Sequence, residues 1–593
     1  GLLTYPDERG MLVVTEVSAR TVATEHGAAS AAAIAKVLWL PLTPFSENAE
    51  EKGQWQPPSG SEQKAEEEQK ADKGQKQRQY LKEFLEAGDM YVSHVGGDLT
   101  HTLQRRAAQR GAGGEGGEGG AASLGDPDER FVWNRIALSP LTEAGRGPWV
   151  TPILQAAILT EQIYLPAGGV LTVSLISRRS CEHAGTRFKT RGLNDAGAAA
   201  NFVETEQVLH LSTQRGSAAS AYVVLRGSVP VFWEQKGRTS LNPKPRVTRA
   251  VELTAPALRG HLESLTKIYG GHLLLLSLLD EKGDETELAS ALSQCVSAVG
   301  NDSVLLSTFD FHAHTKGGSQ HRADGVRALL SKLAATEREA WRPAWLGFYA
   351  AVASNPAHSR GQLGVIRVNC LDCLNRTNMA QTVLALQSAS EQLRGLCRAC
   401  ELPGVDATLA TGKIEATLHA ALRKLWTETG DMISLQYTGT SNLSKGSNIT
   451  GEAARKSLME RASGLVEKGV KTAQRYVHEN FLEDTKQVAI DALLGGGQRG
   501  MLRELSRERA RSSSLLEGGA RPPISIVVGT WNVNGKVASQ DDLMTWLGEI
   551  ATPLPTSPQQ QPPPQPAPPG VYIVGFQEFV DLNAQNLLRD DGG

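Results

Sequence analysis

Short apolar runs alternate with longer amphipathic segments along most of the chain. Apolar runs rich in β-branched residues are typical of strands, and apolar residues at helical spacing are typical of helices. The predicted strands are residues 170–176, 221–225, 301–310 and 363–368. The predicted helices are residues 80–85, 378–386, 416–425 and 453–481. This interleaved pattern predicts an α/β fold of mixed α+β character.

Polar and low-complexity stretches separate these segments. Residues 46–79 are rich in Lys, Glu and Gln and predict a disordered insertion, and residues 111–120 contain seven glycines, which predict a flexible loop. Residues 503–521 are rich in Arg, Ser and Glu and predict a linker. Residues 551–570 hold nine prolines and predict a polyproline-type spacer. An inserted loop without a partner is the favoured interpretation of that spacer, and an SH3-type partner is the alternative.

The most distinctive motif is a cysteine followed six positions later by an arginine and then by a threonine: Cys370, Arg376 and Thr377. A cysteine attacks phosphorus as a thiolate, and the thiolate and the phosphoryl group both need positive charge nearby. The predicted flanking strand and helix place the loop at a helix N-terminus, where free N–H groups and the helix dipole favour an anion. The motif therefore predicts a phosphate loop in which Cys370 is the nucleophile and Arg376 binds phosphate oxygens.

The six cysteines allow a second interpretation. Four of them form two C-x-x-C pairs, Cys370/Cys373 and Cys397/Cys400, and tandem pairs are a zinc-site pattern. The pairs lie further apart than usual, and zinc would block the nucleophile, so the zinc site is the weaker interpretation. Six cysteines in 593 residues, without an apolar signal peptide, indicate a reducing cytosolic setting rather than a disulfide framework.

Charge and hydropathy argue against two broad classes. The formal net charge is −3, from 61 basic and 64 acidic residues, which does not indicate a nucleic-acid partner. No apolar run reaches the roughly 18 residues of a membrane span. The longest candidate, His272–Leu279, is too short and fits a buried strand or helix. Because the chain begins at Gly1 rather than Met, we expect that an N-terminal part is missing.

The series of motifs resembles that of the Sac-type phosphoinositide phosphatases, and among them the synaptojanin-like proteins. The matching stretches are Arg130–Asn134, Ser177–Ser180, Ala184–Arg187, Asn201–Gln207, Arg226–Gln235, Phe309–His312, Cys370–Thr377 and Gly430–Thr440. The resemblance implies a Sac N-terminal subdomain (residues 1–165), a catalytic α/β subdomain (166–495) and a following linker (496–522). It also implies metal-independent hydrolysis of monophosphates from phosphatidylinositol headgroups, such as phosphatidylinositol 4-phosphate or 3-phosphate.

A second resemblance begins after the linker. Residues 524–535 and 571–578 resemble the first two strands of an inositol polyphosphate 5-phosphatase domain, which is itself similar to endonuclease/exonuclease/phosphatase-like enzymes that need magnesium. Asn532 and Glu578 match metal-site positions of that family, and their oxygens suit Mg²⁺. The later motifs of the family are absent before the chain stops, so we expect residues 523–593 to be an inactive, truncated domain.

The motif and the resemblance together suggest a two-step phosphoryl transfer. Cys370 would attack the headgroup phosphorus and form a phosphocysteine, which water then hydrolyses, while Arg376 and the loop amides stabilise the equatorial oxygens. Thr377 would either hydrogen-bond the sulfur or simply begin the helix. Asp372 is the first candidate for the general acid, and bracing the loop is its alternative role. Relatives carry Asp where this chain has Asn375, so either Asp372 supplies the proton or activity is reduced.

Further residues are expected to contact the substrate. The substrate-binding candidates are Leu371, Cys373, Leu374, Asn375, Thr377, Arg226, His312 and Lys316. Arg178, Arg179 and Arg187 fit buried ion pairs equally well. Because the lipid lies in a membrane, we expect a cytoplasmic protein that is peripheral at the cytosolic face. A catalytically impaired phosphoinositide-binding adaptor and a protein tyrosine phosphatase are the alternatives.

Overall fold

A computed structural model of the chain divides into two compact units, residues 1–505 and 506–593. The structure describes residues 2–4, 9–24, 27–41, 75–76, 78–93, 98–112, 127–136, 138, 151–165, 169–214, 216–235, 243–310, 313–314, 325, 328–333, 347–352, 360–400, 410–438, 483–495, 526–532 and 571–577. Each unit is considered by itself.

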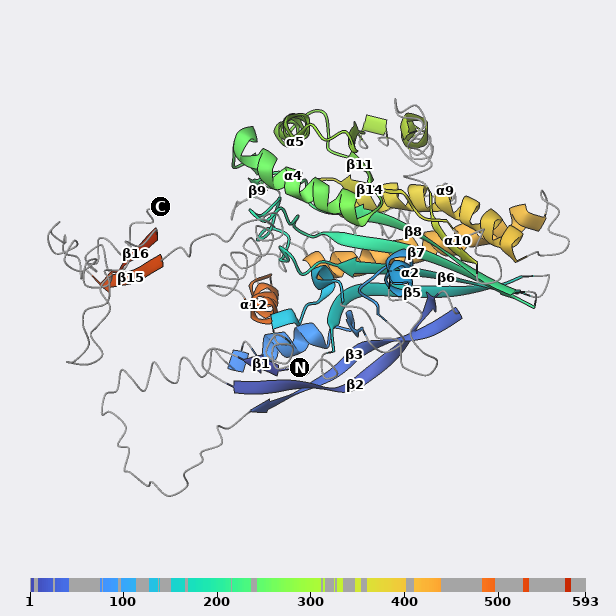
Figure 1. Ribbon diagram of the computed structural model, residues 1–593, viewed down its shortest axis with the longest axis horizontal. Helices are drawn as coiled ribbons and strands as arrows, with labels where there is room; N and C mark the ends of the chain where they lie inside the picture. The colour runs from blue at the N-terminus through green and yellow to red at the C-terminus, as the bar shows by residue number, and fades with distance from the viewer. Residues whose placement is uncertain are drawn as a thin grey trace, which may run out of the picture. The chain divides into compact units, whose positions relative to one another are not determined.

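One 12-stranded sheet runs through the larger unit (Figure 1). Its strands are β1 (Leu2–Thr4), β2 (Arg9–Thr24), β3 (Gly27–Pro41), β4 (Met90–Val92), β5 (Ile153–Leu165), β6 (Gly169–Arg179), β7 (Val203–Thr213), β8 (Gly216–Arg226), β14 (Gly364–Asn369), β11 (His272–Ser277) and β12 (Val304–Thr308), in that spatial order, with β13 (Tyr349–Val352) paired to β8. The short strands β9 (Trp233–Glu234) and β10 (Arg246–Val247) form a separate pair. The helices are α2 (Leu103–Ala112), the 3₁₀ turn η1 (Glu129–Phe131), α4 (Val251–Ile268), α5 (Thr286–Val299), α9 (Asn375–Ala399), α10 (Ala410–Thr438) and α12 (Glu483–Leu494).

The sheet changes from antiparallel to parallel at β8. Strands β1 to β8 pair antiparallel in chain order, whereas β8, β14, β11 and β12 pair parallel. Parallel neighbours need crossover connections, and α5 supplies the one between β11 and β12. Because β14 lies between two parallel neighbours, the carboxyl ends of β8, β11 and β14 meet at one edge. The register sets Val368 beside Arg226 and Asn369 beside Ser277.

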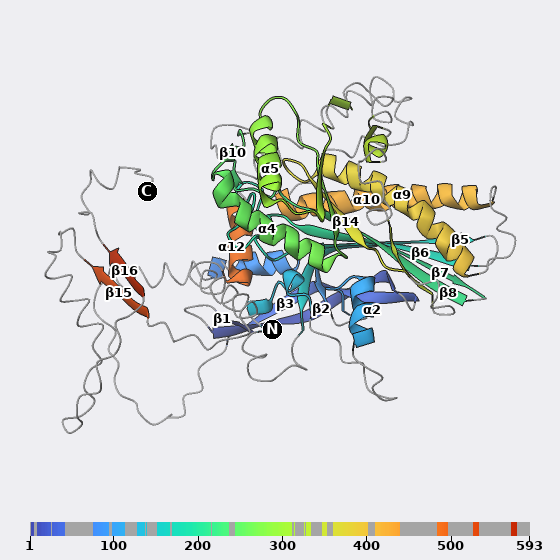
Figure 2. The same cartoon turned by 45° about the horizontal axis from the view of Figure 1, so that its top comes forward.

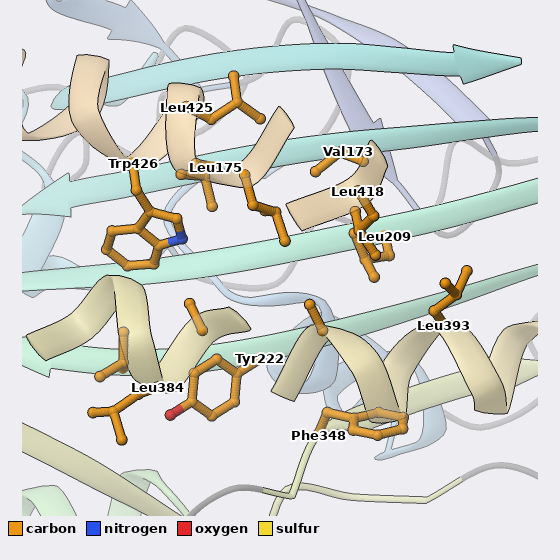
Figure 3. Close-up of a cluster of buried hydrophobic side chains, with 14 of the residues drawn as sticks. Val173, Leu175, Leu209, Tyr222, Phe348, Leu384, Leu393, Leu418, Leu425 and Trp426 are labelled. Carbon is orange, nitrogen blue, oxygen red and sulfur yellow. The ribbon is translucent and has the colours of Figure 1, made fainter. Parts of the chain in front are cut away.

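Helices cover both faces of the parallel part (Figure 2). In β11, Leu274 and Leu276 pack toward α9 and α10, whereas Leu273 and Leu275 pack toward α4 and α5. This alternation explains why His272–Leu279 is apolar throughout, because a strand with both faces covered has no polar side. Figure 3 shows the layer beneath α9 and α10, where Trp426 of α10 and Leu384 of α9 approach Tyr222 of β8.

The amino-terminal strands add a second layer over the antiparallel part. Val22 and Ala31 of the β2–β3 hairpin pack with Leu154, Ile176 and Val208 of the central strands. A separate apolar cluster lies under α12. There Ile490 and Leu493 of α12 pack with residues from the amino-terminal part of the chain, which are Leu81, Phe84 and Trp133. The residues before and after the Cys370 motif in sequence therefore contribute to one connected fold.

Most of the predicted elements are confirmed. Four predicted strands correspond to β6, β8, β12 and β14, the apolar run is the strand β11, and two predicted helices lie within α9 and α10. The mixed α/β class is confirmed as well. The predicted insertion 46–79 is wrong at its end, because residues 75–76 and 78–79 are already helical. The predictions for residues 453–481 and 503–521, and the spacer 551–570, lie outside the described residues.

In the carboxyl-terminal unit, two parallel strands are described, β15 (Ile526–Asn532) and β16 (Val571–Gln577). They coincide with the two strands predicted from the 5-phosphatase resemblance. Their register pairs Asn532 with Gln577, so that Glu578 follows directly after the end of β16. Among the helices in the described part of the chain, none combines the length and apolarity that crossing a bilayer requires.

Candidate active site

The Cys370 loop lies at the edge where the parallel strands end. Cys370 follows β14 directly, and α9 begins at Asn375, so the loop connects a buried strand to a helix N-terminus as the sequence predicts. The neighbouring strand ends bring Gly227 after β8 and Leu278 after β11 close to it. The N–H of Leu278 donates to the carbonyl of Asn369 at 2.8 Å, which joins the two strand ends just before the loop.

Two donors point at the sulfur of Cys370. The backbone N–H of Cys373 and the hydroxyl of Thr377 both lie 3.2 Å from Sγ. Cys370 is 2% exposed. Burial alone raises the pKa of this thiol, but the hydrogen bond from Cys373, the nearby Arg376 charge and the Thr377 hydroxyl lower it to about 5. The loop therefore holds a thiolate at neutral pH, which is the form that attacks phosphorus.

This thiolate gives a testable pH dependence. We expect ultraviolet absorbance of the thiolate to appear with a midpoint near pH 5 as the pH rises, and to be complete at neutral pH. The signal is taken as the difference between the wild-type protein and Cys370→Ser. A midpoint near the ordinary thiol value of about 8.5 would show that the loop does not stabilise the anion.

Arg376 is held by acidic groups that follow β11. Its Nη1 donates to the carbonyl of Leu278 at 2.9 Å, to Asp280 Oδ1 at 3.1 Å and to Glu285 Oε2 at 2.9 Å. Its Nη2 donates to Glu285 Oε1 at 2.6 Å. Burial alone lowers the pKa of Arg376, but Cys370 and Glu285 raise this pKa by more than burial lowers it. The net shift is upward, and the guanidinium stays charged.

Asp372 is bound by two arginines from another part of the chain. Arg187 donates through Nε at 3.1 Å and Nη2 at 2.7 Å, and Arg191 donates through Nη2 at 2.9 Å. Burial alone raises the pKa of Asp372, but Arg187 and Arg191 hold it well below its ordinary value. These contacts therefore hold the carboxyl group as an anion, and its role as general acid stays a prediction. The bracing role, which was the alternative, agrees with these contacts.

Two further arginines lie beside the loop without a carboxylate. Arg226 and Arg367 are both 0% exposed, and among the described residues neither forms an ion pair. Arg226 donates from Nη2 to Asn378 Oδ1 at 2.9 Å, while its Nε and Nη1 have no hydrogen-bond partner in the described structure. Burial lowers the pKa of each to about 10. Buried cations without carboxylates favour an anion nearby, in agreement with a phosphate loop.

The remaining loop residues shape the turn. Cys373 has a φ of 54°, and its thiol donates to the carbonyl of Gly227 at 2.6 Å. Burial and the neighbouring Cys370 raise the pKa of Cys373 well above its ordinary value, so that it stays a thiol. Leu371 and Leu374 are buried, and Asn375 Oδ1 is buried without a hydrogen-bond partner in the described part of the chain.

Four of the other predicted site residues have no described side chain. His312, Lys316 and Glu578 lie outside the described residues, and Asn532 ends β15 without a described side chain. Cys370 and Cys373 precede α9, a helix of 25 residues and so roughly 37 Å long, whereas Cys397 and Cys400 lie at its far end. The pairs therefore cannot share one zinc ion. Arg178 is a structural ion-pair residue, with Nη1 3.1 Å from Glu204 and Nη2 2.7 Å from Glu206.

Sequence reasoning missed two residues of the site. Arg191 donates to Asp372 and to the carbonyl of Leu371 in the loop, and Glu285 accepts from Arg376. For Arg191 and Glu285 the sequence offers no spacing rule, because they reach the loop from separate segments.

A buried strand, a Cys-x5-Arg loop that stabilises a thiolate and a helix N-terminus together form the arrangement that the sequence predicts. The chain belongs to the SacI homology domain family, whose profile matches residues 1–316, more than half of the chain. The resemblance to synaptojanin-like Sac proteins is thereby confirmed.

Known relatives support the same family assignment. Rat synaptojanin-1 is 32% identical over 494 residues, which cover 78% of this chain and 28% of that protein. Zebrafish phosphatidylinositol-3-phosphatase SAC1-B is 31% identical over 402 residues, covering 67% of this chain and 62% of that protein. The yeast polyphosphatidylinositol phosphatase INP53 is 29% identical over 537 residues, covering 86% of this chain and 43% of that protein. The chain thus spans less than a third of rat synaptojanin-1.

Proposed function

We propose that this chain is a phosphatase that removes monophosphates from phosphatidylinositol headgroups, such as phosphatidylinositol 4-phosphate or 3-phosphate. The observation that carries the proposal is the buried Cys370 thiol, whose pKa is lowered to about 5 inside a Cys-x5-Arg loop. Membership of the SacI homology domain family supports the lipid as substrate, as does the name of the zebrafish relative, a phosphatidylinositol-3-phosphatase.

In this proposal the reaction has two chemical steps. Cys370 Sγ attacks phosphorus in line, the S–P bond forms, and the P–O bond to the inositol breaks. Water then attacks the phosphocysteine, the S–P bond breaks, and inorganic phosphate leaves with the thiolate restored. Arg376 and the loop N–H groups stabilise the oxygens on which negative charge accumulates. Because Asp372 is ionised, we assign protonation of the leaving inositol oxygen to a water molecule at the loop.

The same observations favour one rival function. Asn375 cannot donate a titratable proton, and Asp372 is held as a carboxylate, so the loop has no acid of its own. A protein that binds phosphoinositides but turns them over poorly would have this arrangement. A protein tyrosine phosphatase remains the less favoured alternative, because the family match points to lipid substrates.

For the carboxyl-terminal unit we propose a metal role only within a complete domain. The parallel register of β15 and β16 sets Asn532 opposite Gln577, one residue before Glu578. Amide and carboxylate oxygens suit Mg²⁺. These two positions would supply part of its ligands, and the Cys370 reaction would need no metal. We also propose that the protein acts from the cytosol at the membrane surface, drawn there by anionic lipid.

The substrate is tested by phosphate release in the presence of EDTA. The panel contains short-chain phosphatidylinositol 3-, 4- and 5-phosphates and a phosphotyrosine peptide. We expect release from one or more of the lipids and little from the peptide, since the proposed headgroup contacts are absent there. Release from the peptide alone would favour the tyrosine phosphatase. Binding of the lipids without release would favour the adaptor.

A further inference from the structure

Both carboxylate oxygens of Glu285 accept hydrogen bonds from the guanidinium of Arg376. Glu285 Oε1 accepts from Nη2 at 2.6 Å and Oε2 accepts from Nη1 at 2.9 Å. The two side chains are 12% and 10% exposed, so the pair is largely shielded from water. A parallel two-point contact of this kind fixes the rotation of the guanidinium plane as well as its position.

Glu285 is itself fixed by the fold. It stands immediately before α5, and its backbone carbonyl accepts from the N–H of Ala289 at 3.0 Å. Its Oε2 also accepts from the N–H of Asp280 at 2.9 Å. A turn at Gly283, with φ of 93°, returns the chain from β11 to this point. The carboxylate therefore reaches Arg376 from the segment that connects β11, the neighbour of β14, to α5.

The contacts leave one edge of the guanidinium open. Arginine has five N–H donors. Both hydrogens of Nη1 face Leu278, Asp280 and Glu285, and one hydrogen of Nη2 faces Glu285. The Nε hydrogen and the second Nη2 hydrogen make no hydrogen bond within the described structure. These two hydrogens lie on the same edge, which is the geometry that binds two oxygens of one phosphate.

We propose that Glu285 is a positioning residue, which holds Arg376 so that this open edge binds the phosphate at Cys370. The inference rests on the proposed function, because it assigns a role within the same loop. Without the Glu285 charge, Leu278 and Asp280 would still hold Nη1, but Nη2 would lose its charged partner. The open edge would then be less well oriented before phosphate binds, and binding would have to order it.

The test uses inorganic phosphate as the probe and isothermal titration calorimetry of the full chain. We expect Glu285→Gln to weaken phosphate binding roughly 10-fold and to lower kcat for lipid by a similar factor. Glu285→Asp, which keeps the charge, should recover part of the loss. The matched control is Asp284→Asn, which removes the neighbouring carboxylate that pairs with the exposed Lys244 and should change binding less than about 2-fold.

A double-mutant cycle separates positioning from a general structural role. In an Arg376→Ala background, Glu285→Gln should weaken phosphate binding no further, because the residue it positions is gone. Equal weakening in both backgrounds, or unchanged or tighter binding in Glu285→Gln alone, would overturn the inference. Weaker phosphate binding in a chain that releases no phosphate from any lipid would support the inference while overturning the proposed function.

Discussion

Replacing Cys370 with serine is expected to reduce phosphate release from phosphoinositides by roughly 10³-fold or more. The loop stabilises a thiolate through hydrogen bonds from Cys373 and Thr377 and through the Arg376 charge. A serine hydroxyl has a far higher pKa than a thiol, so the same environment leaves it protonated and weakly nucleophilic. The measurement is kcat/KM for the best lipid of the panel, in EDTA.

Binding and chemistry are separated in the same variant. Because the arginines around the loop are unchanged, Cys370→Ser should bind the lipid within about 3-fold of the wild-type affinity. Cys397→Ser is the matched control, since Cys397 lies near the far end of α9, away from the loop. Mass spectrometry of the quenched wild-type reaction should find one phosphoryl group on the peptide that contains Cys370. Substantial turnover by the serine variant would exclude the cysteine mechanism.

Replacing Asp372 with asparagine is expected to destabilise the fold by about 3 kcal/mol, which is roughly a 10²-fold change in the unfolding equilibrium. The substitution leaves Arg187 and Arg191 buried without their carboxylate, at 9% and 2% exposure. Removing one partner of a buried ion pair costs more than the pair itself contributes, because the other charge stays desolvated. Chemical denaturation at neutral pH measures the loss.

The pH dependence of this loss has a defined sign. The two arginines depress the pKa of Asp372 below its unfolded value of about 4, so the carboxylate stabilises the fold above that pH. The stabilisation disappears as the pH falls further. The stability difference between wild type and Asp372→Asn should therefore be largest at neutral pH and shrink in acid.

The control for the stability loss is a variant that removes a carboxylate from an exposed ion pair. Asp195→Asn removes a carboxylate from an exposed pair with Arg249 and should cost less than about 0.5 kcal/mol. If Asp372→Asn instead kept full stability and lost a high-pH decline of kcat that the wild type shows, Asp372 would be the general acid after all. Such a decline would report a proton donor that ionises within the working range.

Much of the site could be predicted because it is local in sequence. Cys370, Arg376 and Thr377 lie within eight consecutive residues, and the flanking strand and helix follow from apolar periodicity. Local spacing therefore indicated a loop at a helix N-terminus, and the structure has β14 and α9 at those places. The apolar run His272–Leu279 was ambiguous, since periodicity does not distinguish a strand covered on both faces from a buried helix.

The ionisation of Asp372 could not be predicted from the sequence. Its partners Arg187 and Arg191 precede it by 185 and 181 residues, and the partner of Arg376, Glu285, precedes it by 91. The protonation state of a carboxyl group depends on the charges that surround it in space. No pattern near Cys370 contains that information.

The sequence by itself determined the strand, the loop and the helix that hold Cys370 and Arg376, because these elements form from contiguous residues. Only the tertiary structure decided the ionisation and the orientation of the side chains in the loop. Parallel pairing of β14 with β8 and β11 brings Arg226 and the Glu285 segment to one edge, and the Arg187–Arg191 segment closes over Asp372. Electrostatic interactions act through space at short range, so the ionisation of Cys370 and Asp372 and the orientation of Arg376 depend on segments far away in the chain.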